Sequence, residues 1–249
     1  TVDLVVDATG PGRHLQRQTG VAVESMDDPL LSGDGVEWLL QGDSSTTARW
    51  RERVSFMLGH DGRPRGEGWL SPLAQAGLAH AVCRLAPPDR PKVPLGEALR
   101  RLLQRCGLDQ LPVLDRHGGR VASTIHRLQP LGDGSLLAVG DAASTANLLG
   151  GEGIRHAIDS ASVLSDCLLS GGSHREFQAA LRQRFGWRWT VSNRLARRTW
   201  WGLNSAEADR RMTRLIHGLS GQASAEDLSS LWFADRFERY GWRLLPELR

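Results

Sequence analysis

The 249-residue sequence contains little cysteine, no long apolar run and no secretory signal. Its three cysteines, Cys83, Cys106 and Cys167, are widely spaced and form no CxxC pair, which argues against a zinc site and against disulfides. Because no run approaches about 18 apolar residues, no segment is predicted to span a membrane. These absences indicate a reducing compartment, and we expect a cytoplasmic protein.

An excess of positive charge is also missing. The net charge is only +3 although the calculated pI is near 9.1, and nearly all basic residues are arginine. No recognition motif accompanies these arginines, so no nucleic-acid partner is expected. Hydrophobic residues make up 40% of the chain, which is enough for one large domain or two smaller ones.

The most informative segment is LLAVGDAASTANLLGGEGIRHAIDS, residues 136–160. Its first four residues are apolar, which is typical of a strand buried on both faces, and a ligand in such a sheet binds beyond the carboxyl end of the strand. Asp141 lies at that end, and Ala142 leaves room for a ligand. The glycines that follow, Gly150, Gly151 and Gly153, allow backbone conformations closed to other residues.

A helix is predicted to begin at Ile154, so that its amino end points toward the ligand. Helical spacing places six residues on one face of this helix: Ile154, Ala157, Ile158, Ala161, Ser165 and Leu168.

This segment resembles the second flavin-contacting motif of the geranylgeranyl reductases, which belong to the p-hydroxybenzoate-hydroxylase-like group of FAD enzymes. The start of the chain, DLVVDATGPGR, resembles the strand and DAxG segment of the family, in which Gly10 lets the backbone pass close to FAD. The segments VSFMLG and GEGWLSPL resemble a strand of the substrate sheet and the aromatic-W-x-F-P motif. The resemblance spans residues 3 to about 169.

The resemblance implies an α+β or α/β fold with a partial, Rossmann-like FAD-binding domain, an antiparallel substrate-binding sheet and a helical C-terminal region. We expect the strand and DAxG turn at residues 1–14, the substrate sheet at 15–130, the FAD-binding strand, loop and helix at 131–172, and the helical region at 173–249. Within these, strands are predicted at 35–40, 47–58, 68–85 and 121–128, and a helix at Leu95–Cys106.

The cofactor implied is FAD. The Asp141 carboxylate would accept hydrogen bonds from the ribitol hydroxyls, although an aspartate after a strand can also be a turn residue or a helix cap. The backbone from Gly150 to Ile154 would lie near the flavin pyrimidine ring. Asp7 faces the cofactor or holds the turn that follows it. The predicted cofactor-binding set is Asp7, Gly10, Asp141, Ala142, Gly150, Gly151, Glu152, Gly153 and Ile154.

No side chain is marked as catalytic. His156 lies at helical spacing from Glu152 and Asp159, which favours a histidine paired with a carboxylate along the helix over a proton donor. Arg13 and His14 reach a phosphate or form a solvated loop pair; the sequence leaves both open.

The family's N-terminal GxGxxG unit, whose amides bind the FAD pyrophosphate, has no counterpart here. The nearest match, Gly10-Pro11-Gly12, has no third glycine, and Pro11 lacks an amide donor. We therefore interpret the chain as an N-terminally incomplete flavoprotein: a fragment, the product of a misplaced gene start, or one half of a split protein whose partner supplies the missing unit.

Trp69 and Pro72 are predicted to line the substrate cavity. Glu67 and Ser71 stand where the family usually has aromatic residues, and the alternative for Trp69 is a core aromatic of the sheet. The C-terminal third interleaves tryptophan with arginine, which is explained by helix packing, by a surface resting on a lipid interface, or, least favoured, by nucleic-acid binding.

The activity implied is a FAD-dependent oxidoreductase that reduces an isoprenoid C=C bond by hydride transfer from reduced flavin. NADPH or ferredoxin would be the electron source, and the substrate would be an isoprenoid or another apolar small molecule. The alternatives are a lycopene-cyclase-like enzyme, a FAD monooxygenase of the same fold, or a non-catalytic remnant.

Overall fold

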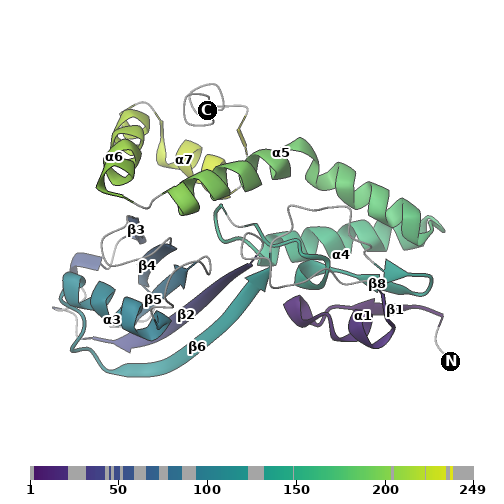
Figure 1. Ribbon diagram of the computed structural model, residues 1–249, viewed down its shortest axis with the longest axis horizontal. Helices are drawn as coiled ribbons and strands as arrows, with labels where there is room; N and C mark the ends of the chain where they lie inside the picture. Colours follow the sequence, from purple (N-terminus) through teal and green to yellow (C-terminus); the bar gives the residue numbers. More distant parts are fainter. Residues whose placement is uncertain are drawn as a thin grey trace. The chain divides into compact units, whose positions relative to one another are not determined.

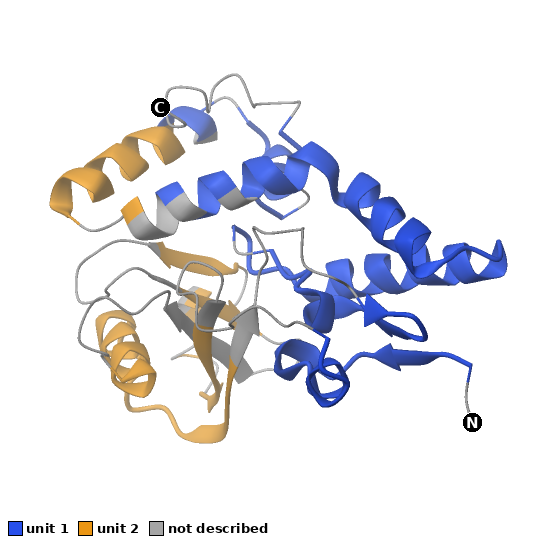
Figure 2. Ribbon diagram, turned by 45° about the vertical axis from the view of Figure 1, so that its right-hand side comes forward, with its two compact units in different colours: residues 1–32, 121–199, 218–249 blue, residues 33–120, 200–217 orange. Residues whose placement is uncertain are grey.

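The structure is a computed structural model that describes residues 3–21, 32–42, 45, 48–50, 53–58, 66–72, 78–85, 94–122, 132–147, 149–202, 205–221, 223–233 and 236–237. The chain divides into two compact units (Figure 2). Unit 1 comprises residues 1–32, 121–199 and 218–249, and unit 2 comprises residues 33–120 and 200–217. Together they have the mixed helix and sheet composition predicted from the sequence.

Unit 1 is built on a small sheet with the strand order β1-β8-β7 (Figure 1). Strands β1 (Val5–Asp7) and β8 (Leu136–Ala138) are parallel, and β7 (Gly132–Asp133) pairs antiparallel with β8. All three residues of β8 are buried, as predicted for a strand covered on both faces. A 3-10 turn follows each parallel strand, η1 (Gly10–Gly12) after β1 and η3 (Gly140–Ala143) after β8. Both turns therefore lie at the same edge of the sheet.

Unit 1 also contains several helices. They are α1 (His14–Gln18), α4 (Ile154–Leu169), most of α5 (His174–Gly202) and α7 (Ala225–Phe233). One core cluster joins β8, α4 and α5 through Leu137, Leu164, Cys167, Phe177, Leu181, Phe185 and Trp189.

Helix α5 is kinked at Gly186. The backbone there has φ 54° and ψ −152°, a conformation that only glycine adopts readily. Phe185 and Trp189, on the two sides of this kink, both belong to the core against α4. The kink thus lets both parts of α5 cover the same helix.

Helix α4 begins at Ile154 as predicted, but the face named from the sequence pattern is not its buried face. Ile154 is 82% exposed and Ile158 is 62% exposed, and Ala161, Ser165 and Leu168 are exposed as well. The buried residues are instead His156, Ser160, Leu164 and Cys167. The helix carries two stripes at helical spacing, and the less apolar one faces the core because α5 supplies aromatic partners on that side.

Unit 2 contains a sheet with the strand order β3-β4-β5-β2-β6. Its strands are β2 (Ser32–Gln41), β3 (Ser55–Leu58), β4 (Gly66–Pro72), β5 (Leu78–Leu85) and β6 (Val113–Ala122). The pairs β2–β5, β3–β4 and β4–β5 are antiparallel, which confirms the antiparallel character of the predicted substrate sheet.

Helix α3 (Leu95–Cys106) packs on one face of that sheet and has the bounds predicted from its leucine spacing. It ends at Gly107, whose φ of 69° is the left-handed conformation common at helix ends. The core between helix and sheet contains Trp38, Leu40, Leu70, Ala98, Leu99, Leu102, Leu103 and Leu108.

Two strand predictions need correction. The strand expected at 47–58 is only Ser55–Leu58, because Ala48–Trp50 forms the 3-10 turn η2. Of the strand expected at 121–128, residues 121–122 are the end of β6, which already begins at Val113; residues 123–128 lie outside the described part.

The C-terminal region is helical as predicted, with α5, α6 (Ala206–Ser220) and α7. Trp189 is buried in the core, whereas Trp187 is exposed with the Arg188 guanidinium 5.7 Å from its ring centre. Helix packing therefore accounts for Trp189, whereas Trp187 stays exposed although its ring centre lies 6.5 Å from that of the buried Phe237. No helix within the described ranges is long and apolar enough to cross a membrane.

Candidate functional site

The two turns at the sheet edge of unit 1 are joined to each other. The amide of Val139 donates to the carbonyl oxygen of Asp7 at 3.1 Å, and Gln16 Nε2 donates to the carbonyl oxygen of Ala142 at 3.0 Å. The Arg13 guanidinium donates to Ser144 Oγ. Residues about 130 positions apart in the sequence thus form one edge, beyond the carboxyl ends of two parallel strands, where ligands of such sheets bind.

Asp7 is fully buried and its carboxylate is occupied by the protein. Oδ1 accepts from the amide and hydroxyl of Thr9 at 3.0 and 2.6 Å, and Oδ2 accepts from the amide and Nε2 of Gln16 at 3.1 and 3.4 Å. Burial raises the pKa of Asp7, but these hydrogen bonds outweigh it and the net pKa is lowered. The contacts are those of a residue that holds the turn; its role toward a cofactor stays a prediction.

Asp141, in η3, is different. It is half-buried, and its carboxylate has no hydrogen-bond or ion-pair partner among the residues that the structure describes. Burial alone raises the pKa of Asp141. A side chain at Gly153 would begin 3.8 Å from Asp141 Oδ1, so this carboxylate lies beside the amino end of α4. At this edge of the sheet, Asp141 is therefore a hydrogen-bond acceptor that no described residue uses.

The glycines around Asp141 are required for different structural reasons. Gly140 has φ +60°, and a Cβ there would lie 3.2 Å from the Cβ of Ala157 on α4. A Cβ on Gly150 would lie 2.6 Å from the carbonyl oxygen of Trp232, so the backbone of α7 requires glycine at this position. Gly10, with φ +74°, has no described atom within 4 Å of its Cβ position, which leaves space beside the turn η1. Sequence pattern cannot separate a glycine required by a ligand from one required by a helix far along the chain.

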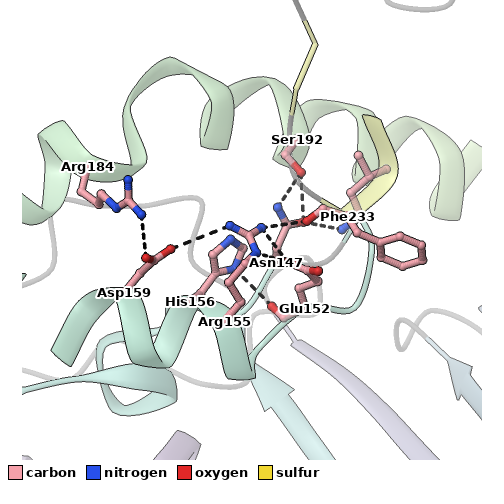
Figure 3. Close-up of polar contacts among 9 residues, drawn as sticks. Asn147, Glu152, Arg155, His156, Asp159, Arg184, Ser192 and Phe233 are labelled. Atoms are coloured by element: carbon pink, nitrogen blue, oxygen red, sulfur yellow. Dashed lines mark hydrogen bonds and ion pairs between the residues drawn. The ribbon is translucent and has the colours of Figure 1, made fainter. Parts of the chain in front are cut away.

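The loop between η3 and α4 is held by residues that pattern analysis missed. Asn147 Nδ2 donates to Ser192 Oγ at 2.7 Å, and Ser192 Oγ lies 2.9 Å from Asn147 Oδ1 (Figure 3). The Leu149 amide donates to Asn147 Oδ1 at 2.7 Å, and the Asn147 amide donates to the carbonyl oxygen of Glu152 at 2.7 Å. This buried asparagine fixes the loop to α5 before Gly153 begins the helix.

His156 lies in the core rather than on the site. Its ring contacts those of Phe185 and Trp189, with centroids 5.3 and 4.9 Å away, and Nδ1 is 3.3 Å from the carbonyl oxygen of Glu152. The expectation that a helical carboxylate would pair with this histidine is not what the contacts show.

Those carboxylates pair with arginines instead (Figure 3). Arg155 Nε donates to Glu152 at 2.6 Å, and Arg184 Nη2 donates to Asp159 at 2.6 Å. Arg155 also donates to the carbonyl oxygen of Phe233 at 2.7 Å, which ties the end of α7 to the beginning of α4.

The sequence left two interpretations for Arg13 and His14. His14 is exposed, whereas Arg13 is only 3% exposed, so the pair is not a solvated loop pair.

Trp69 lies on β4 in unit 2, between Gly68 and Leu70, which are both buried. Leu70 belongs to the core under α3, and successive side chains of a strand alternate between faces, so Trp69 lies on the sheet face opposite α3. Its ring centre is 6.3 Å from that of Phe56, which is 45% exposed. Trp69 is therefore not part of the core between this sheet and α3; its contact with a substrate, and that of Pro72, stay predictions.

The residues at the sheet edge of unit 1 fit a polyhydroxy cofactor chain. Asp141 offers an unoccupied acceptor, and the Thr145 hydroxyl, 3% exposed, has no hydrogen-bond partner among the described residues. A buried hydroxyl without a hydrogen-bond partner lowers the stability of the fold, and a hydrogen bond to a bound polar group or water would offset this loss. The described ranges contain no group of three or more potential metal ligands.

Comparison with known proteins shows the fold. The chain is similar to a geranylgeranyl bacteriochlorophyll reductase-like protein from Thermoplasma acidophilum, with a TM-score of 0.69, 19% identity, and coverage of 100% of this chain and 62% of that chain. It is also similar to a flavoprotein/dehydrogenase from Cytophaga hutchinsonii (TM-score 0.55, 15% identity, 98% and 61% coverage) and to a probable FAD-dependent monooxygenase from Pseudomonas aeruginosa (0.54, 18%, 83% and 57%).

No family model and no curated protein matches the sequence. The structural comparisons nevertheless establish a fold like that of geranylgeranyl-reductase-like FAD oxidoreductases. The chain spans about 62% of the length of the first of these proteins.

Proposed function

We propose that this chain is the flavin-holding part of a FAD-dependent oxidoreductase of the geranylgeranyl reductase type. The observation that carries the proposal is Asp141: a partly buried carboxylate without a protein partner among the described residues, at the edge where the turns after two parallel strands meet. A carboxylate kept desolvated and unpaired reduces stability, and groups of this kind concentrate at functional sites. The fold shared with flavoproteins supports FAD as its ligand.

In the proposed site each group has a separate role. Asp141 orients the ribityl chain by accepting hydrogen bonds from its hydroxyls, and the amides from Gly150 to Ile154 face the pyrimidine ring. The positive end of the α4 dipole favours negative charge there, by about 1 kcal/mol when exposed. When bound and reduced, FAD would supply hydride to an isoprenoid C=C bond, and a proton would complete the reduction. Trp69 would contact the apolar chain, whose burial contributes about 0.8 kcal/mol per methylene, and NADPH or ferredoxin would reduce the flavin.

The pyrophosphate and adenosine of FAD need a further binding site. The described residues include no GxGxxG turn between a parallel strand and a helix, and the chain spans only part of the length of its structural neighbours. We therefore propose that a strand, glycine-rich turn and helix outside these 249 residues bind the pyrophosphate.

The test is a comparison of three flavins. Riboflavin, FMN and FAD are titrated into the purified chain, and binding is followed by the flavin absorbance and fluorescence. We expect all three to bind with affinities within about threefold, since each contact here reaches the part that they share; a contact to the pyrophosphate would separate them by more.

Asp141→Asn should weaken riboflavin about tenfold or more, as expected for the loss of a charge-assisted hydrogen bond. The matched control is Asp166→Asn on the exposed side of α4, which should leave affinity unchanged. If none of the three flavins binds, or if Asp141→Asn behaves like its control, the proposal is wrong.

The finer activity needs a separate assay. Dithionite-reduced, FAD-loaded protein is incubated with a geranylgeranyl substrate, and the product mass is measured. A reductase adds two hydrogens per double bond, a cyclase conserves the hydrogen count, and a monooxygenase needs O₂. A cyclase product has the mass of the substrate but a different chromatographic retention time. Recovery of the substrate itself, with unchanged mass and retention time and no O₂ uptake, from protein that retains flavin would favour a non-catalytic remnant.

Contact with a membrane surface belongs to the same proposal, because it would deliver an isoprenoid. Exposed Trp187 and Arg188 on α5 are the residues that would contact lipid. Sedimentation with phosphatidylglycerol vesicles, with Trp187→Ala as the variant, tests it; no association of the unaltered protein would rule it out.

A further inference from the structure

The strongest unassigned feature is a buried contact between the two turns. Arg13 and Ser144 are the non-glycine residues with positive φ in the described part of the chain, at +47° and +55°. Each ends a 3-10 turn, Arg13 after η1 and Ser144 after η3. Their side chains, both buried, are hydrogen-bonded to each other. Residues with side chains rarely adopt this backbone conformation unless their surroundings impose it.

Ser144 is coupled directly to Asp141. The Ser144 amide donates to the carbonyl oxygen of Asp141 at 3.0 Å, and the next amide, that of Thr145, donates to the carbonyl oxygen of Gly140 at 3.2 Å. The Thr145 bond requires the left-handed conformation at Ser144, because the φ and ψ of Ser144 set the direction of the amide that follows it. The orientation of Asp141 therefore depends on what holds Ser144.

We infer that Arg13 is a positioning residue of the flavin site, which holds Ser144 in its left-handed conformation and so directs the Asp141 carboxylate toward the ligand. The inference rests on the proposed function. It deepens that function by giving the turn after β1 a role, since η1 supplies the arginine that orders η3. The buried guanidinium acts through Ser144 and does not itself contact the flavin.

The first measurement is the dissociation constant of riboflavin for Arg13→Gln. We expect about tenfold weaker binding, the size found when a hydrogen bond to a charged group is lost. The control is Arg17→Gln, the same substitution four residues later on the exposed side of α1, which should leave the constant unchanged. Thermal unfolding without flavin is recorded for every variant, so that loss of fold is separated from loss of affinity.

The second measurement is a rescue. Glycine adopts positive φ without strain, so Ser144→Gly keeps the turn without needing an arginine. The double variant Arg13→Gln/Ser144→Gly should bind riboflavin within about threefold of the unaltered chain, whereas Arg13→Gln/Ser144→Ala should remain weak. Rescue would not occur if Arg13 bound the flavin itself or only stabilised the fold at large.

The third measurement uses Asp141→Asn. Because Arg13 acts through Asp141, adding Arg13→Gln to Asp141→Asn should weaken binding no further, while independent effects would multiply. If Arg13→Gln fails to fold, Ser144→Ala and Ser144→Gly alone decide the question, since only the alanine variant should lose affinity. Riboflavin that fails to bind the unaltered chain refutes the proposed function; riboflavin that binds Arg13→Gln equally well, or an absent rescue, refutes only this inference.

Discussion

Asp7 and Asp141 occupy nearly the same place in the sheet and have opposite surroundings. Asp7 ends β1 opposite Ala138, the last residue of β8, and Asp141 follows three residues later. The protein donates four hydrogen bonds to Asp7, and the pKa of Asp7 is lowered. Asp141 receives none from the described residues, and burial raises its pKa. The difference separates an aspartate that stabilises the fold from one that is open to a ligand.

The comparison also shows why residue type alone is a poor guide to function. Both aspartates follow a short run of apolar residues and precede a small-residue turn. They differ in the segment that follows the turn. After Asp7, helix α1 places Gln16 where its amide donates to the Asp7 carboxylate, whereas the loop after η3 is held to α5 by the hydrogen bond between Asn147 and Ser192. Among the described residues, the donors needed by Asp141 are thus absent from its own surroundings.

The largest effect is expected from Asp7→Ala. It leaves buried donors of Thr9 and Gln16 without acceptors, which should lower the free energy of unfolding by about 3 kcal/mol or more. Urea unfolding followed by circular dichroism measures the change. A loss below about 1 kcal/mol would mean that water replaces the carboxylate, and that Asp7 resembles Asp141 more than its contacts indicate.

A smaller loss is expected from Thr9→Val, which is close to threonine in shape. It removes the hydroxyl that donates to Asp7 at 2.6 Å and accepts from the His14 amide at 2.9 Å. We expect the free energy of unfolding to fall by about 1 kcal/mol and the pKa of Asp7 to rise. Titration of the Asp7 carboxyl carbon by NMR gives the second readout, for which an unchanged pKa would contradict the assigned hydrogen bond.

Asp141→Asn should act in the opposite direction. The amide removes a desolvated charge without breaking a described protein contact, so the flavin-free chain should gain about 0.5 kcal/mol of stability at pH 7. The same substitution weakens riboflavin, so stability and binding change in opposite senses. Reduced stability of this variant would show that Asp141 has a structural partner after all.

The smallest effects lie in the pH dependence, and their signs differ. Asp7, whose folded pKa is lowered, contributes stability above its unfolded value of about 4, and this is lost as pH falls through the folded pKa. Asp141, whose folded pKa is raised, contributes stability below about pH 4, and this is lost as pH rises through the folded pKa. The free energy of unfolding of the unaltered chain is therefore compared with that of each variant from about pH 3 to 7. The difference from Asp7→Asn should shrink as the pH falls, and the difference from Asp141→Asn should grow as the pH rises toward 7.

Local features of the fold were predictable from the sequence. The strand at 136–138, the beginning of α4 at Ile154 and the bounds of α3 follow from apolar runs and leucine spacing, which act within a few turns of chain. The inward face of α4 was not predictable, because Ile158 and Leu164 both lie on stripes with helical spacing. The aromatic residues of α5 decide between these stripes, and they come from a different part of the sequence.

In the candidate site, too, some features could be predicted from the sequence and others could not. By itself, the sequence determined the small-residue turn with Asp141, the glycines near it and the resemblance to flavin-binding motifs, because these depend on neighbouring residues and their allowed backbone conformations. Only the tertiary structure decided that Asp7 is occupied, that Gly150 accommodates α7, and that Arg13 meets Ser144 across 131 positions. Hydrogen bonding and burial depend on which segments come together, and no local pattern contains that information.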